Sequence, residues 1–432
     1  MSIFTRLQAI ILGVLVWAAA LFFAPWFYTD SFEYPKAIFF IIATGVLTII
    51  TLAQRISDES SFSFRRLPIE LKLFGVMVLA ELIAFIFSTD RSLSLSGAPY
   101  RFQGLIAQLT IAVYFLNVVY IFQHFPSSVS FRRIFFGWLV GSAVVTSAVS
   151  LLPFFVDTPF LDIAAFRYRA YGTFGNPNYL AVFLIGLIPI FSFFFNSTSR
   201  FVRLISFAGL GVTLVTLFLT GCRSAWIGSI LGFLIIALLV ARKRKLYRMV
   251  IITGFVIVLS VGIFVFQKFT ETQLFHRLSL TEDNVGSVTT RVYLQKAGLQ
   301  LFLERPILGT GQEAIAGRIE PYLPAYLKSN DIFYIDRTHN EFLDVLVMQG
   351  IVGFFAYMAF WIVLLWNAIR HYLSVKYKKS EMDHEKIFLF SIASIFSILA
   401  YYGMNFSTIS GNILLYFFAG CLLAAKRIVS RK

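Results

Sequence analysis

Long apolar runs alternate with short polar segments along the chain, and this pattern predicts helices that cross a membrane. About twelve runs reach the 18–25 residues that a bilayer core requires of a helix. They cover approximately residues 7–27, 36–53, 69–88, 103–122, 132–153, 178–195, 201–220, 223–241, 247–267, 341–369, 386–404 and 408–425. Since a strand of an outer-membrane barrel needs only about ten residues, the predicted fold class is an all-α polytopic membrane protein.

One polar stretch is much longer than the others, and it divides the predicted architecture into three parts. Residues 1–267 hold the first nine spans, residues 268–340 form one large external loop, and residues 341–432 hold the last three spans. Long loops in compact proteins are usually functional. Apolar positions after Thr289-Thr290-Arg291 predict a surface helix in this loop, with Thr289 or Thr290 as its N-cap and an end at Pro306.

Composition excludes most other classes of protein. Of the 432 residues, 58% are hydrophobic and only 14% are charged, against about 25% charged in ordinary soluble domains. These values exclude a soluble globular domain, a disordered chain, a coiled coil and a disulfide scaffold. Cys222 and Cys421, the two cysteines, lie in different apolar runs, so they predict neither a disulfide framework nor a metal site.

The net charge of +15 is explained by membrane topology. With the N-terminus in the cytoplasm, most of the 37 lysine and arginine residues fall in cytoplasmic segments, and the short external loops contain almost no lysine. This bias predicts that both termini are cytoplasmic. It also removes the need for a nucleic-acid partner.

Arginine dominates the positive charge that remains outside. Arg223 is the clearest case, because it lies in a tight turn, Thr220-Gly221-Cys222-Arg223-Ser224, between two spans. A guanidinium binds phosphate groups bidentately, so external arginines are candidate phosphate ligands. The alternative is an interfacial arginine whose side chain reaches lipid headgroups.

His339 is the second candidate, in Asp336-Arg337-Thr338-His339-Asn340-Glu341, directly before an apolar run. An imidazole can act as a base near neutral pH. Asp336 could orient the ring, and Thr338 or Asn340 could cap the helix that follows. The alternative is a polar residue that marks a helix end.

Several common site motifs do not occur in the sequence. It has no Asp-x-Asp pair, no His/Cys metal spacing, no Walker loop and no dinucleotide-binding glycine motif, so we predict neither a metal nor a cofactor. Glu81 is the one acid well inside a span, whereas ion-coupled transporters usually carry more. The ionisable residues at the external face therefore favour chemistry on a lipid headgroup over transport.

The chain resembles the O-antigen ligase and O-antigen polymerase superfamily of bacterial inner-membrane glycosyltransferases. The resemblance extends over most of the chain, and its order and spacing are more specific than any one motif. The motifs are Phe87-Ser88-Thr89-Asp90, Gly97, Tyr100-Arg101-Phe102-Gln103-Gly104, Gly172-Thr173-Phe174-Gly175-Asn176-Pro177-Asn178, Thr220-Gly221-Cys222-Arg223-Ser224-Ala225, Thr290-Arg291, Arg305-Pro306-Ile307-Leu308-Gly309-Thr310-Gly311, residues 336–344 and Gly350-Ile351-Val352-Gly353. Cys222 and Thr338 replace the residues that the family usually has there.

The resemblance implies a function and roles for these residues. The donor would be a glycan on undecaprenyl diphosphate, used on the external face of the cytoplasmic membrane in an inverting, metal-independent transfer. The family's essential histidine corresponds to His339 and its two essential arginines to Arg223 and Arg291. We expect Arg169 or Arg167 to help these arginines bind the diphosphate and stabilise the leaving group, while His339 activates the acceptor hydroxyl. Asp336, Arg337 and Asn340 would support the histidine.

The sequence does not identify the acceptor of the glycan. A ligase would transfer the glycan to a lipid or an envelope polymer, a polymerase to a second lipid-linked repeat, and a protein O-oligosaccharyltransferase to Ser or Thr of an exported protein. From a different class, a flippase for lipid-linked saccharides is compatible with twelve spans. A non-catalytic assembly scaffold would tolerate loss of His339 and Arg223 together.

Overall fold

The computed structural model describes residues 3–26, 30–57, 67–124, 129–156, 158, 169–195, 197–243, 282–324, 327, 335–375 and 382–430. This part of the chain is helical and contains no strand. The α-helices are α1 (Ile3–Leu21), α2 (Glu33–Ser57), α3 (Ile69–Ile86), α4 (Arg91–Ser96), α5 (Leu105–Gln123), α6 (Val129–Leu151), α7 (Pro177–Leu187), α8 (Arg200–Leu219), α9 (Arg223–Lys243), α12 (Glu282–Glu304), α14 (Glu341–Ser374), α15 (Met382–Tyr402) and α16 (Ile409–Ser430). Short 3-10 helices cover Leu152–Phe154, Gly172–Phe174, Ile188–Phe193 and Glu320–Tyr322.

Nine helices within these residues are long and apolar enough to cross a membrane: α1, α2, α5, α6, α8, α9, α14, α15 and α16. Two further predicted spans are also helical. The helix α3 carries three charged residues, and α7 continues into the 3-10 helix that ends at Phe193. The prediction of an all-α polytopic membrane protein is therefore confirmed. The predicted span 247–267 lies outside the described residues, as does much of the loop between residues 268 and 340.

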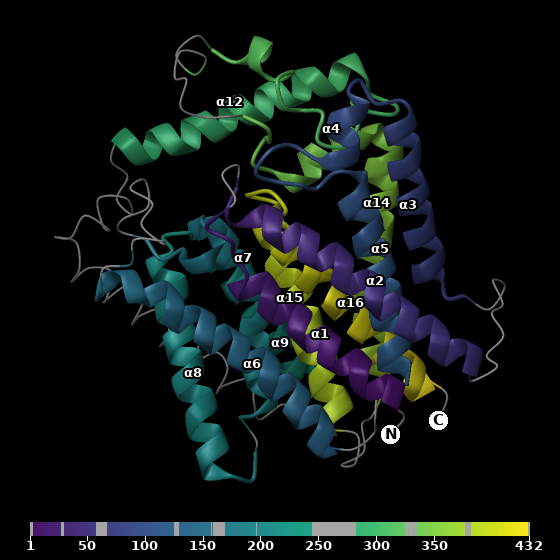
Figure 1. The fold of residues 1–432 in the computed structure, drawn as a ribbon, viewed down its shortest axis with the longest axis vertical. Helices are drawn as coiled ribbons and strands as arrows, with labels where there is room; N and C mark the ends of the chain where they lie inside the picture. Colours follow the sequence, from purple (N-terminus) through teal and green to yellow (C-terminus); the bar gives the residue numbers. More distant parts are fainter. Residues whose placement is uncertain are drawn as a thin grey trace.

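The long helices run side by side, and α12 lies across one end of the bundle (Figure 1). The short helix α4 lies at the same end, while both chain termini lie at the opposite end. The helices α7 and α16 form the interior, since nearly all of their side chains are buried. The prediction of an N-cap at Thr289 or Thr290 is wrong, because α12 begins at Glu282 and these threonines lie within it.

Aromatic side chains fill the core between four helices. The ring of Phe74 on α3 lies 4.4 Å from that of Phe115 on α5 and 5.3 Å from that of Phe360 on α14. The ring of Tyr416 on α16 lies 6.0 Å from those of Phe74 and Phe115. Edge and tilted contacts between such rings stabilise the packing beyond the buried area alone. The bundle thereby fixes α14 and α16, whose N-terminal ends adjoin the candidate site.

The helix α14 is broken at Gly350, which has φ 64° and ψ −169°. Residues 306–311 are inserted at the break and bind both exposed ends of the backbone. The N–H groups of Thr310 and Gly311 donate to the Val347 and Met348 carbonyls (2.9 Å each). The Ile351 N–H donates to the Pro306 carbonyl (2.8 Å). The break therefore leaves few backbone groups unpaired, as burial requires.

Candidate active site

The segment that carries His339 is fixed by hydrogen bonds at the start of α14. The Asn340 side chain accepts from the backbone N–H groups of Phe342 and Leu343 (3.1 and 3.3 Å), so Asn340 is the N-cap. The Asp344 carboxylate accepts from the N–H and the hydroxyl of Thr338 (2.8 Å each). His339 lies between these two anchors in a left-handed conformation, with φ 59°. A non-glycine residue with this backbone is uncommon and often marks a functional position.

The imidazole of His339 lies against the turn between α15 and α16. Its ring centroid is 5.0 Å from that of Phe406, and the Asn405 side chain faces it. Burial, followed by the nearby charges of Arg291 and Arg101, lowers the pKa of His339 from 6.5 to about 4. The ring is therefore uncharged at neutral pH and can accept a proton. Its Nδ1 atom is buried and has no hydrogen-bond partner within the described part of the chain.

Arg291 reaches the same turn from α12. Its Nη1 atom donates to the carbonyl oxygen of Met404 (3.3 Å), and its side chain is half-buried. The charge of Arg291 is the strongest electrostatic influence on His339. Since α12 and α14 are separated by 36 residues in the sequence, the fold brings this expected pair together.

Arg223 and Arg169 lie at the turn between α8 and α9. Arg223 is the first residue of α9, is half-buried, and has no hydrogen bond or ion pair with the described residues. The Arg169 Nε atom donates to the Thr220 carbonyl (2.6 Å), and the guanidinium lies over Gly221. The structure therefore brings Arg169 to the turn that carries Arg223. Arg167 lies outside the described residues.

The turn that carries Arg223 lies near α15, because Cys222 and Arg291 both act electrostatically on Tyr401 of that helix. The helix α9 packs against α15, and α15 ends just before the Met404 carbonyl that Arg291 binds. Arg291 and His339 thus meet at the turn after α15, and Arg169 and Arg223 lie together at the start of α9, which packs against α15. An anion that reached this region would meet several positive charges.

Asp336 does not bond to His339. Its carboxylate accepts two hydrogen bonds from Arg101, at 2.7 Å from Nε and 3.0 Å from Nη2. Although burial acts to raise the pKa of Asp336, the Arg101 guanidinium holds it below its usual value. Arg101 also lies over the ring of Phe406, 3.7 Å from the centroid. The sequence selected neither Arg101 nor Phe406 as a site residue. Only the place of Arg101 in a predicted external loop and in one of the family motifs could have suggested this arginine.

Arg337 faces away from His339, into the protein. Its guanidinium forms a buried ion pair with Glu313 and contacts the sulfur of Met348 at 3.6 Å. Burial raises the pKa of Glu313, and the charge of Arg337 opposes this effect. Arg337 therefore anchors the segment that precedes His339 to the loop after α12.

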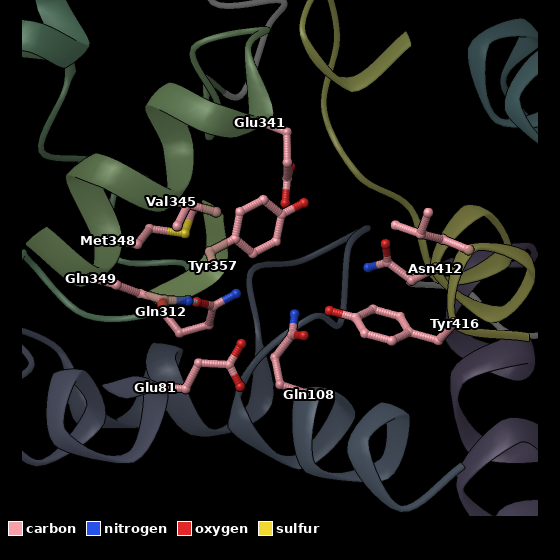
Figure 2. A pocket seen from close by; sticks show the side chains of 11 residues that line it. Glu81, Gln108, Gln312, Glu341, Val345, Met348, Gln349, Tyr357, Asn412 and Tyr416 are labelled. Carbon is pink, nitrogen blue, oxygen red and sulfur yellow. Dashed lines mark hydrogen bonds between the residues drawn. The ribbon is translucent and has the colours of Figure 1, made fainter. Parts of the chain in front are cut away.

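A small polar cavity of about 20 Å³ lies beside the first half of α14. Figure 2 shows Glu81 and Gln108 on one side of it and Gln349, Tyr357 and Glu341 on the other. The volume suits one water molecule, not a sugar. The cavity places Glu81, the acid inside a predicted span, close to the break in α14.

Part of the chain matches a known protein family. Residues 207–358 match the family model described as O-antigen ligase. The matched segment contains Arg223, Arg291 and His339, whereas Arg101 and Phe406 lie outside it. No curated protein matches the chain.

Proposed function

We propose that the protein transfers a glycan from undecaprenyl diphosphate to an acceptor hydroxyl on the external face of the bacterial cytoplasmic membrane. The match of residues 207–358 to the O-antigen ligase family model supports this proposal. The observation that carries this proposal is the meeting of Arg291 and His339 at the turn after α15. The donor needs cations for its diphosphate, and the acceptor needs a base.

In this mechanism the acceptor oxygen attacks the anomeric carbon of the donor glycan, with inversion. The bond between that carbon and the phosphate oxygen breaks, and the lipid diphosphate leaves with the bonding electrons. The acceptor proton passes to the uncharged ring of His339. Arg223 and Arg291, helped by Arg169 and Arg167, stabilise the charge on the diphosphate.

The bound diphosphate also changes the basicity of His339. The free site holds the imidazole pKa near 4 because burial and the arginine charges disfavour a charged ring. The negative charge of the donor offsets those arginines, so it raises the imidazole pKa toward neutrality. His339 then becomes a stronger base only when the donor is bound, which couples proton transfer to donor binding.

The test uses purified full-length protein in detergent, a lipid-diphosphate oligosaccharide and EDTA. Wild-type protein should release lipid diphosphate, while His339→Ala and Arg223→Ala should not, although both should remain folded by thermal unfolding. Full activity in both variants would exclude this mechanism. The acceptor class is then assigned by supplying a lipid or polymer, a second lipid-linked repeat, or a Ser/Thr-containing protein.

A flippase for lipid-linked saccharides is the second candidate, and the break in α14 favours it. Broken helices and a buried acid such as Glu81 occur in transporters. A flippase moves the donor across the bilayer without consuming it. Loss of the donor in detergent, without any gradient, therefore separates the two functions.

A further inference from the structure

Arg101, Phe406 and His339 form a stack between three segments of the chain. Arg101 lies in the segment between α4 and α5, and its guanidinium carbon is 3.7 Å from the centroid of the Phe406 ring. The His339 ring centroid is 5.0 Å from the same ring. Phe406 is therefore in contact with the cation and with the imidazole.

The guanidinium of Arg101 has little freedom to move. Its Nε and Nη2 atoms donate to the two oxygens of Asp336, and nine-tenths of each of these side chains is buried. A bidentate pair fixes both the position and the plane of a guanidinium. Asp336 is only three residues before His339, so the pair also connects Arg101 to the segment that carries the histidine.

The Phe406 backbone is fixed as well. The next residue, Ser407, donates its N–H to Glu341 (2.8 Å) and its hydroxyl to Gln103 (2.8 Å). The Gln103 amide in turn donates to the Ser407 carbonyl (3.1 Å). Gln103 follows Arg101 by two residues. The same segment therefore contacts the ring of Phe406 through Arg101 and the backbone beside Phe406 through Gln103.

We propose that Arg101 is a positioning residue for His339: fixed by Asp336, it holds Phe406 against the imidazole and disfavours a positive charge on that ring. The role of His339 as the base rests on the proposed function. The contact of Arg101 with the ring of Phe406 is observed in the structure and does not depend on the proposed function. Arg101 acts on the reaction through Phe406 and His339.

The charges around the imidazole support this assignment. The groups that face it are Arg291 on α12, Arg101, and Asp336 in its own segment, with the uncharged Asn405 amide from the turn after α15. Asp336 favours a charged imidazole, and the charge of its partner Arg101 opposes that effect. Loss of Arg101 removes one positive charge and also leaves the Asp336 carboxylate unpaired. Both changes raise the pKa of His339, and burial and Arg291 alone then oppose its protonation.

The experiment compares Arg101→Gln, Arg101→Lys and Phe406→Leu with wild-type full-length protein. Arg318→Gln is the matched control, because Arg318 also pairs with a carboxylate (Glu304, 3.0 Å) but at an exposed position away from His339. The first readout is the ¹³C NMR titration of the histidine rings between pH 5 and pH 8.5. The chain has five histidines, and His339→Gln identifies the signal of His339.

In wild-type protein and in Arg318→Gln, we expect His339 to stay uncharged over this range. In Arg101→Gln its titration midpoint should rise by about one pH unit or more, so that protonation appears near the acid end. Arg101→Lys keeps the charge but loses the planar bidentate contact, so its midpoint should rise less. Phe406→Leu should leave the midpoint unchanged.

The second readout is the pH profile of glycan transfer. Arg101→Gln should lose about tenfold or more of the rate at neutral pH, and its acid limb should move upward with the NMR midpoint. Phe406→Leu should lose rate without a shift of the acid limb, and Arg101→Lys should recover part of the loss. A wild-type midpoint and a rate within twofold of wild type in Arg101→Gln would overturn the proposal.

The two readouts separate this inference from the proposed function. If wild-type protein transfers no glycan, the proposed function fails, but the NMR midpoints still decide whether Arg101 controls the charge of His339. If Arg101→Gln does not fold, Arg101→Lys and Phe406→Leu decide, and wild-type behaviour of both would reject the positioning role.

Discussion

The backbone N–H of Ser407 donates a 2.8 Å hydrogen bond to the Glu341 carboxylate, which joins the turn after α15 to the first turn of α14. The bond is buried, and Glu341 follows His339 by two residues. The Glu341 N–H also donates to the Asn405 carbonyl (2.9 Å). The position of His339 relative to Phe406 therefore depends on Glu341.

Glu341→Ala should lower the rate of glycan transfer about tenfold or more, because a misplaced catalytic group loses rate steeply with distance. Glu341→Gln should stay within about threefold of wild type, since an amide oxygen can still accept from Ser407. Steady-state transfer assays check both variants. Equal loss in the two would mean that the charge of Glu341 matters, not its bond to Ser407.

Gly350→Ala should destabilise the protein by about 2 kcal/mol or more. Gly350 has φ 64°, and an added Cβ would lie 2.3 Å from the Ile307 carbonyl oxygen. Gly45→Ala on α2 is the matched control, because its Cβ would meet no atom within 4 Å and its backbone is helical. Thermal unfolding in detergent compares Gly350→Ala with Gly45→Ala. Equal melting temperatures would show that the backbone at Gly350 tolerates a side chain and would contradict this prediction.

Arg337→Met should cost about 3–5 kcal/mol, because it leaves Glu313 buried without a partner. The loss should grow as the pH rises, since an unpaired buried carboxyl is tolerated only in its protonated form. Glu313→Gln added to Arg337→Met should recover part of the stability. Arg318→Met, which breaks the exposed pair with Glu304, should change stability by less than about 1 kcal/mol. Thermal unfolding at two pH values compares these three variants with the wild-type protein.

The stability of the wild-type protein should fall as the pH drops from about 6.5 to about 4, in part because of His339. Its folded-state pKa, about 4, lies below the unfolded value of 6.5, so the unfolded chain binds the proton first over this range. His339→Gln removes this contribution, and its stability should depend less on pH in that window. The free energy of unfolding of both proteins is measured between pH 4 and pH 7. The same dependence on pH in the two proteins would contradict the lowered pKa of His339.

The membrane helices could be predicted from the sequence because their signal is local. A run of apolar residues long enough to span a bilayer needs no information about its neighbours. The break in α14 could not be predicted in this way, because Gly350 lies inside an apolar run and its backbone is set by the inserted residues 306–311. The N-cap of α14 was predicted as Thr338 or Asn340, and the structure selects Asn340.

The residues of the candidate site were partly accessible to sequence reasoning. Arg223, Arg291 and His339 were selected from a turn, a helix and a helix start, and the structure brings Arg291 and His339 to the same turn. The partner of Asp336 was not accessible, because Arg101 is 235 residues away and competes with the expected contact to His339. Arg167 and the predicted span 247–267 lie outside the described residues, so these expectations stay predictions.

The break at Gly350 also bears on how the protein responds to membranes of different thickness. A spanning helix adapts to a thicker or thinner bilayer by changing its tilt. The segment of α14 before Gly350 is bound to residues 310–311 and to the turn at 405–407. The segment after it is bound at its start to Pro306 through the Ile351 N–H and then continues into the bundle, where α14 packs against α3, α15 and α16. Tilting of the second segment can be absorbed at Gly350, so the geometry around His339 should be insensitive to acyl-chain length.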